Sequence, residues 1–341
     1  MILNGQSSKY ILEIGIVLVN YISELKEVWR RVRGRLTFEY GSDLIRALNR
    51  HLDIGFNIFF YPLNPTEMKK RGEVIVVGWD FSEYSELALD HALFYSYQTN
   101  MKICLVHIVK RESDKDTYTL KLREEVERVY KKTGKQIDMI VRSGRVSEGL
   151  SSVAEEISAA VIFIGTHGVQ GIQNYTGSHV LKTILSSTVP FVIVQAPREK
   201  HTHFSLICPV DARKESKEIL YWVAFFAQIF AAKISLVYPE YKTSTKILRT
   251  RANVNFSKHY LAKNKVRFEE VKLSAKRFNN AIVEYAKKKH ADLILTITNR
   301  QPKVQNLFSA SKIQYLIANK EKIPVLCLNP RKDLWLYGAY K

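Results

Sequence analysis

Short runs of consecutive apolar residues alternate with longer segments of mixed polarity through most of this chain. The runs, such as VIVVG at 74–78 and VIFIG at 161–165, are rich in Val and Ile and contain no charged residue. Uninterrupted apolar runs of this length are typical of parallel strands that are covered on both faces. Because segments of helix length separate the runs, the pattern predicts a doubly wound α/β fold.

The same pattern places the individual elements. In the first part of the chain it predicts strands at 73–79, 102–108, 136–142, 160–164 and 190–195, and helices at 82–98, 117–133, 146–158 and 177–187. Farther along it predicts strands near 204–210, 233–238, 266–272, 292–297 and 324–328. Each set has five strands.

The two sets of strands are related by a repeat. Three pairs of positions match at a spacing of 131 residues: Asp80 with Asp211, His107 with Tyr238, and Ala160 with Ala291. A constant spacing over so long a stretch indicates two copies of one domain. We expect two tandem parallel five-stranded sheets with helices on both faces, at 68–200 and 201–330, followed by a tail at 331–341. The last strand of each copy is apolar, so we expect the two edges to pair within the chain as a pseudo-dimer.

Residues 1–67 lie outside the repeat. Apolar residues at a 3-4 spacing between Ile11 and Val32 favour one helical stripe. Two interpretations stay open. The extension packs on the main body or on a second molecule, or it is a dispensable appendage preceding a start at Met68.

Charge changes the picture in the last part of the chain. The net charge is +19, and residues 201–341 hold 26 Lys and Arg against 10 Asp and Glu. A polyanionic partner and a solvated basic surface both remain open. No nucleic-acid motif accompanies the charges, so we expect no specific nucleic-acid site.

Composition excludes several other classes of protein. The most apolar early run, residues 10–22, contains Glu13 and Asn20 and is too short to span a bilayer. We therefore expect no membrane partner and a cytoplasmic protein. The three cysteines, Cys104, Cys208 and Cys327, are scattered in apolar runs, which favours buried free thiols over disulfide or metal chemistry.

The stretch GTHGVQGIQNYTGS at 165–178 holds four of the fifteen glycines of the chain. It follows a predicted strand and precedes a predicted helix, at the edge where open parallel sheets bind ligands. Free backbone N–H groups and the helix dipole there favour phosphate. Neither a Walker loop nor a G-x-G-x-x-G fingerprint is present. A glycine-rich turn without a ligand is the alternative.

Asp80 ends the first predicted strand, with Ser82 as the expected N-cap of the next helix. A hydrogen bond to an adenine amino group and simple local capping are both open for this aspartate.

With these features in order, the chain resembles a tandem universal stress protein over roughly residues 68–330. The resemblance rests on the strand that ends in Asp80, LVHIV in the second strand, Gly144 after the third, and the G-x-x-G…G-[ST] loop. It implies a five-stranded parallel domain that dimerises through its last strand. Many members of the family bind ATP and others do not.

Carried over to this sequence, the resemblance implies an ATP site, with or without magnesium, in the first copy only. Its residues would be Asp80 and Ile108 at the adenine, and Gly165, His167, Gly168, Gly177 and Ser178 around the ribose and phosphates. The loop departs from the common family pattern, because eight residues instead of nine separate Gly168 from Gly177.

The second copy lacks the glycines. By the spacing of 131, the counterparts of Gly165, His167 and Gly168 are Thr296, Thr298 and Asn299. We therefore expect a degenerate second domain, one nucleotide per chain, and a stress-response protein that acts through an unknown protein partner. The alternatives are a ligand-free interaction module with a basic docking half, or a weak ATPase. No catalytic or metal-binding residues are expected, and a further homodimer stays open.

Overall fold

The computed structural model describes residues 72–167, 183–185, 187–199, 201–298 and 313–329. All of them belong to one compact unit, Tyr61–Lys341. The extension at 1–67 and the tail at 331–341 lie outside the described residues, so both remain sequence-based expectations.

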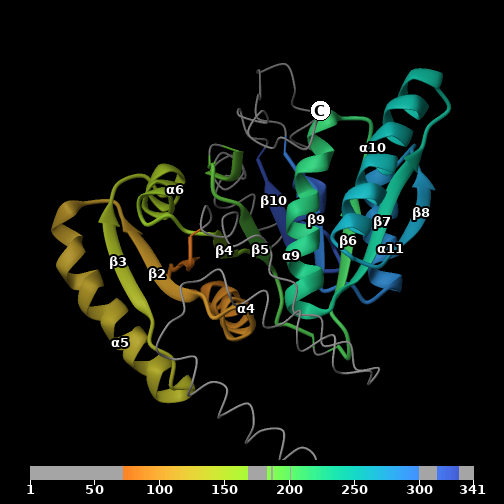
Figure 1. The fold of residues 1–341 in the computed structure, drawn as a ribbon. Coiled ribbons are helices and arrows are strands. Elements are labelled where there is room, and N and C mark those ends of the chain that lie inside the picture. The colour runs from red at the N-terminus through yellow and green to blue at the C-terminus, as the bar shows by residue number, and fades with distance from the viewer. Residues whose placement is uncertain (1–71, 168–182, 186, 200, 299–312, 330–341) are drawn as a thin grey trace, which may run out of the picture. The chain divides into compact units, whose positions relative to one another are not determined.

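The first half alternates strands and helices as the apolar pattern predicts (Figure 1). Its elements are β1 Val74–Gly78, α4 Glu83–Thr99, β2 Lys102–Val109, η1 Glu112–Asp114, α5 Lys115–Thr133, β3 Asp138–Ser143, α6 Val146–Glu156, β4 Val161–Gly165 and β5 Phe191–Val194. Residues 183–185, just before β5, are helical as well.

The second half repeats this sequence of elements. It consists of β6 Ser205–Pro209, η2 Lys214–Ile219, α9 Leu220–Phe230, β7 Lys233–Glu240, α10 Ser244–Lys263, β8 Phe268–Ser274, α11 Phe278–Lys288, β9 Leu293–Ile297 and β10 Val325–Leu328. Residues 313–317, before β10, are helical. The main difference is at the start of the first helix, where the short 3-10 helix η2 precedes α9.

The strands form one sheet of ten, in the order β3-β2-β1-β4-β5-β10-β9-β6-β7-β8. Pairing is parallel within each half and antiparallel between β5 and β10, where Val192 lies opposite Leu326. The two five-stranded sheets expected from the sequence are therefore joined edge to edge, and the strands of the two halves point in opposite directions.

Alternate residues of the strands enter two separate cores. One core packs under α4, α5, α9 and α10, and the other packs under α6, α11 and the helical segments before β5 and β10. Both faces of the central strands are thus buried, which explains why their sequences show no polar alternation. The three cysteines are free and buried, and burial raises the pKa of the Cys104 thiol to about 12.

Aromatic side chains pack between the two halves, in the core under α4 and α9. Phe94 and Tyr95 of α4 meet Phe226 and Phe230 of α9, with Phe204 between them. Ring centroids lie 5.8 Å apart for Tyr95 and Phe226, 5.4 Å for Phe94 and Phe230, and 4.7 Å for Phe204 and Phe230. Edge and stacked ring contacts of this kind add to the burial energy of large apolar groups.

The spacing between matching positions changes twice along the chain. Val74 pairs with Lys102 and Ser205 with Lys233, so the offset of 131 holds for the first strands. From α6 and α11 to β4 and β9 the offset is 132, because three residues separate β8 from α11 where two separate β3 from α6. For the last strands, β5 and β10, the offset is 134. The sequence match of Ala160 with Ala291 is therefore wrong by one residue: the N–H of Ala160 donates to Val74, and that of Asp292 donates to Ser205.

In the described part of the chain, no helix has the length and apolar character needed to span a bilayer.

The joint between β5 and β10 gives a test of stability. Val192 is 1% exposed and faces the first core. We expect Val192→Lys to lower the free energy of unfolding by roughly 3 kcal/mol or more, because an ammonium group there is buried without a counter-charge. Thermal denaturation followed by circular dichroism measures the loss. Leu120→Lys, at a side chain that is 59% exposed, is the matched control. An unchanged melting temperature for Val192→Lys would contradict the pairing.

Candidate functional site

The residues that the sequence singled out lie at the carboxyl ends of β1, β2 and β4, which are adjacent in the order β2-β1-β4. Gly78 pairs with Val106, so Asp80 and Ile108 each stand two residues beyond the same rung of the ladder. Gly165 closes β4 and His167 follows it. The structure therefore brings the four described candidates to one edge, where open parallel sheets hold their ligands.

Asp80 is exposed and organises the turn into α4. Its Oδ1 accepts the backbone N–H of Ser82 at 3.0 Å and the Ser82 hydroxyl at 2.5 Å. Ser82 is the N-cap of α4, as expected, and its side chain accepts from the N–H of Ser85. Oδ1 of Asp80 therefore has the local capping role that the sequence left open. Within the described residues, Oδ2 has no hydrogen-bond partner, and it is available to a ligand.

An aromatic cluster packs beside this turn. Phe81 has φ of 64°, a conformation that costs energy for a side chain of its size. Its ring meets His107 at 5.0 Å and Tyr118 at 5.8 Å. The Nδ1–H of His107 donates to the carbonyl of Trp79 at 2.7 Å. These contacts hold the backbone on both sides of Asp80.

Ile108 is half-buried beneath α6. A Cβ added at Gly149 of α6 would lie 3.0 Å from Cδ1 of Ile108. Gly149 therefore lets the helix approach the end of β2 closely. Sequence reasoning passed over this glycine, because a single glycine within a helical pattern carries no signal of what lies across from it.

Gly165 has a packing role that its place in the glycine loop did not suggest. A Cβ at Gly165 would stand 1.8 Å from the carbonyl oxygen of Tyr84, in the first turn of α4. No side chain fits between two backbones at that distance. The glycine thus brings the start of the loop against the N-terminal end of α4.

Tyr84 and His167 make a second link between α4 and the loop. The Tyr84 hydroxyl is hydrogen-bonded to Nδ1 of His167, and the two rings meet edge to face with centroids 5.0 Å apart. Desolvation of the hydroxyl and the neighbouring Glu83 raise the pKa of Tyr84, so the phenol stays protonated near neutral pH. Tyr84 is a site residue that the sequence did not reveal.

The remaining predicted loop residues, Gly168, Gly177 and Ser178, lie outside the described residues, as do Asn299 and the rest of the loop at 299–312. Their assignment continues to rest on the sequence.

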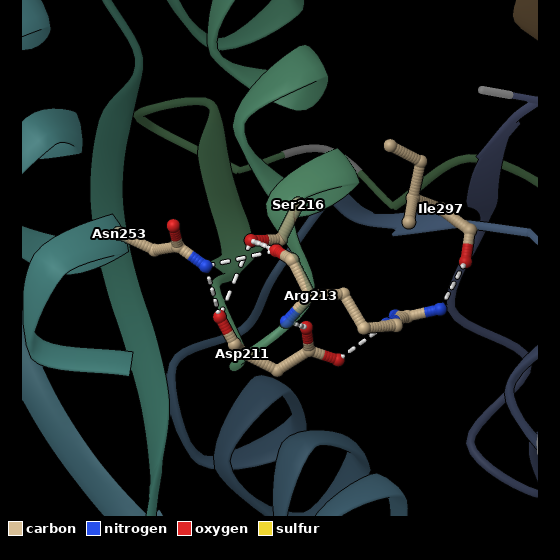
Figure 2. Close-up of polar contacts among 5 residues, drawn as sticks. All are labelled: Asp211, Arg213, Ser216, Asn253 and Ile297. Carbon is tan, nitrogen blue, oxygen red and sulfur yellow. Dashed lines mark hydrogen bonds and ion pairs between the residues drawn. The ribbon is translucent and has the colours of Figure 1, made fainter. Parts of the chain in front are cut away.

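At the matching edge of the second half, Asp211 takes part in a network of polar contacts within the chain (Figure 2). Asp211 forms the same turn as Asp80, with its Oδ1 accepting the backbone N–H of Arg213 at 2.8 Å. Arg213, however, stands where the first half has Ser82. Its Nε donates to Oδ2 of Asp211 at 2.8 Å, and its Nη1 donates to the carbonyl of Ile297 at 3.4 Å. Both carboxylate oxygens of Asp211 are therefore engaged.

Further contacts fix Arg213 in place. The side-chain amide of Asn253 donates to the backbone carbonyls of Asp211 and Arg213, each at 2.8 Å. The hydroxyl of Ser216 donates to the backbone carbonyl of Arg213 at 2.7 Å. Desolvation and the charge of Asp211 raise the pKa of the neighbouring Tyr241. Figure 2 shows the Arg213 side chain spanning from Asp211 to Ile297.

The change of offset from 131 to 132 also corrects the expected counterparts in the second loop. Gly165 ends β4 as Ile297 ends β9, so its counterpart is Ile297 and not Thr296. Thr166 matches Thr298, since each donates its N–H to the last strand of its own half, at Val194 and Leu328. The counterpart of His167 is accordingly Asn299.

In the described ranges, no group of three or more His, Cys, Asp or Glu side chains is arranged to hold a metal ion.

Comparison with known proteins agrees with the fold. The model of the universal stress protein family matches residues 73–195. Comparison with curated proteins gives no match.

Solved structures extend the similarity in fold. A universal stress protein from Archaeoglobus fulgidus DSM 4304 matches with a TM-score of 0.61 and 16% identity, over 77% of this chain and 98% of that chain. A functionally unknown protein from Pseudomonas aeruginosa PAO1 matches with a TM-score of 0.55 and 13% identity, over 77% and 95%. Because residues 1–195 make up less than 77% of the chain, both matches reach into the second half.

Residues 73–195 therefore belong to the universal stress protein family. The fold of the described unit is the mixed α/β fold, with a large and mostly parallel sheet, that these structures share.

The close approach at Gly165 can be tested. We expect Gly165→Ala to lower the free energy of unfolding by about 1–3 kcal/mol, because its Cβ forces the backbone of Tyr84 away. Gly134→Ala is the control: Gly134 has φ of 70° but no atom within 4 Å of an added Cβ. Its loss should be about 1 kcal/mol, from backbone conformation alone. Chemical denaturation measures both, and a Gly165→Ala variant as stable as the wild type would contradict the packing role.

Proposed function

We propose that this chain is a universal stress protein that binds one adenine nucleotide, ATP, at the carboxyl edge of its first half. Bound nucleotide would change the order or shape of this edge, and a protein partner would recognise the change. The expected contacts are Asp80 and Ile108 at the adenine, with the loop from Gly165 to Ser178 at the phosphates.

The contrast between Asp80 and Asp211 carries the proposal. The two aspartates stand in the same turn, two residues beyond the first strand of their halves. Oδ2 of Asp80 is open among the described residues, whereas Oδ2 of Asp211 holds the guanidinium of Arg213 at 2.8 Å. A guanidinium, like an adenine amino group, offers N–H donors to a carboxylate. In the second half, the Arg213 guanidinium thus takes the position at the aspartate that we propose for the adenine amino group in the first half.

The loop supports the same assignment. Gly165 brings the beginning of the loop against α4, and Tyr84 holds His167 at its start. His167, at the start of the loop, therefore stands at the same edge of the sheet as Asp80. Backbone N–H groups near a helix N-terminus are well suited to phosphate oxygens.

We propose that the second half is a diverged copy of the first and forms an intramolecular pseudo-dimer with it. The equal strand order and the equal registers of β1–β2 and β6–β7 support this. Left-handed residues support it as well: Asn100 and Ala231 recur at a spacing of 131, and so do Gly134 and Lys265.

A ligand-free interaction module is the second candidate, and α10 favours it. This helix of 20 residues contains no Asp or Glu, and four of its five Lys and Arg side chains are exposed. Its counterpart α5 carries four acidic residues among its basic ones. An acidic surface on a partner protein would suit α10. Neither candidate assigns an enzymatic reaction, and we propose that any hydrolysis of ATP is incidental.

Titration of the purified chain with ATP tests the nucleotide site. We expect a stoichiometry near one, and a dissociation constant raised about 10- to 100-fold in Asp80→Ala, since a hydrogen bond to a charged group is lost. Asp211→Ala is the matched control and should bind as the wild type does. Ser82→Arg, which copies the second half, should fill the first site and abolish binding.

Two results would contradict the proposal. An Asp80→Ala variant with unchanged affinity would show that the nucleotide binds elsewhere. A wild type that neither retains nucleotide on purification nor binds added ATP would leave the interaction module as the better candidate.

A further inference from the structure

We propose that the amino edge of the second half binds the phosphate backbone of a nucleic-acid duplex, without regard to base sequence. This surface is independent of the proposed nucleotide site. The strands of the second half, β6 to β10, pair with one another in parallel, so their amino ends share one edge of the sheet. Basic side chains gather on the segments that lead into four of these strands.

Nine Lys and Arg side chains are exposed along this amino edge. Each of the segments that lead into β7, β8, β9 and β10 contributes at least one of them. The acidic residues of the same segments, Asp292 and Glu321, are half-buried. The nine are Lys233 at the start of β7, Lys263, Lys265 and Arg267 before β8, Lys287, Lys288 and Lys289 before β9, and Lys320 and Lys322 before β10.

Ion pairs use only part of this charge. Lys289 pairs with Glu269 at 2.9 Å, and Glu321 pairs with Lys287 at 2.8 Å and with Lys320 at 3.8 Å. Five of the other basic side chains form no ion pair within the described residues, and they are available to a second molecule: Lys233, Lys263, Arg267, Lys288 and Lys322.

The helix dipole does not account for this concentration of charge. Cations near a helix C-terminus interact favourably with the dipole, and this holds equally for the helices of the first half. However, α6 ends in Glu155 and Glu156, whereas its counterpart α11 ends in Lys287 and Lys288. The same structural position therefore carries opposite charge in the two halves, and the basic edge is a property of the second half alone.

The chemistry of the edge favours a duplex over other polyanions. Among the described residues of these segments, no large apolar or aromatic side chain is exposed. A protein interface has an apolar centre rich in aromatic residues, and single strands stack their bases on aromatic rings. A duplex backbone needs only cations, since it presents one phosphate charge per about 1.7 Å of its axis. Five strand ends about 4.8 Å apart extend over about 19 Å, so several cations reach phosphates at once.

Two triple variants of the full chain, each losing three positive charges, test this surface by fluorescence anisotropy with a labelled duplex of mixed sequence. The edge variant carries Lys233→Gln, Lys263→Gln and Arg267→Gln. We expect its dissociation constant to rise about 10- to 100-fold at about 0.1 M salt, and the slope of log affinity against log salt to become less steep by about 3.

The control variant carries Lys246→Gln, Arg249→Gln and Arg251→Gln, in the first part of α10. Arg251 stands twelve residues before Lys263, which is about 18 Å along the helix and beyond the screening length of about 10 Å at 0.1 M salt. The control should therefore bind the duplex with the affinity and the salt slope of the wild type. Circular dichroism checks that both variants are folded.

Three results would overturn the assignment. Equal losses of affinity in the two variants would show a response to net charge alone. A wild type that binds no duplex even at low salt would exclude the surface outright. Tighter binding of the wild type to polyglutamate, to a single strand or to vesicles containing phosphatidylserine than to the duplex would identify a different polyanion as the partner. None of these measurements requires ATP to bind, so the proposed nucleotide site is tested separately.

Discussion

The antiparallel pairing of β5 with β10 is the constraint on which the described structure depends. Each half ends in a short strand buried at all four residues, and left alone it would expose an apolar edge to other chains. Pairing the two edges creates a single sheet, reverses the direction of the strands and brings α4 against α9 through the aromatic cluster. The same reversal sets each strand end beside the start of its neighbour, so that the Nδ2 group of Asn329 donates to the carbonyl of Ser187 at 2.6 Å and the Nε2 group of Gln195 donates to the carbonyl of Ile317 at 2.7 Å.

Much of this fold could be predicted from the sequence, because its signals are local. The first strand, expected at 73–79, is β1 at Val74–Gly78, and the helix expected at 82–98 is α4 at Glu83–Thr99. Apolar runs and the Ser82 cap specify such elements through neighbouring residues. The extra residue between β8 and α11 was missed for a physical reason as well. Ala160 and Ala291 begin similar apolar runs and align well by composition, whereas the true register is set by hydrogen bonds to β1 and β6.

The candidate site likewise has residues that the sequence indicated and residues that it could not indicate. The sequence indicated Asp80 and Gly165, because an aspartate after a strand and a glycine-rich stretch between a strand and a helix are local features. It could not indicate Tyr84 beside His167, or Arg213 across from Ile297, because these contacts join segments more than 80 residues apart. The direction of a long side chain such as arginine depends on the whole fold. Arg213 changes the interpretation of the second half most. The sequence showed only that the second loop lacks the glycines, whereas the structure shows that the Asp211 carboxylate is already bound by Arg213.

The reversed strand direction also gives the chain a polarity. A symmetric dimer of two identical domains presents the same binding edge at both ends, and either end serves a partner equally. In this chain the carboxyl edges of the two halves face opposite ways, and one carries an aspartate with an open oxygen while the other carries an aspartate bound by Arg213. The carboxyl edges of the two halves therefore differ chemically. Of the two described edges, one leaves its aspartate open and the other does not, and this difference lies at opposite ends of the strands.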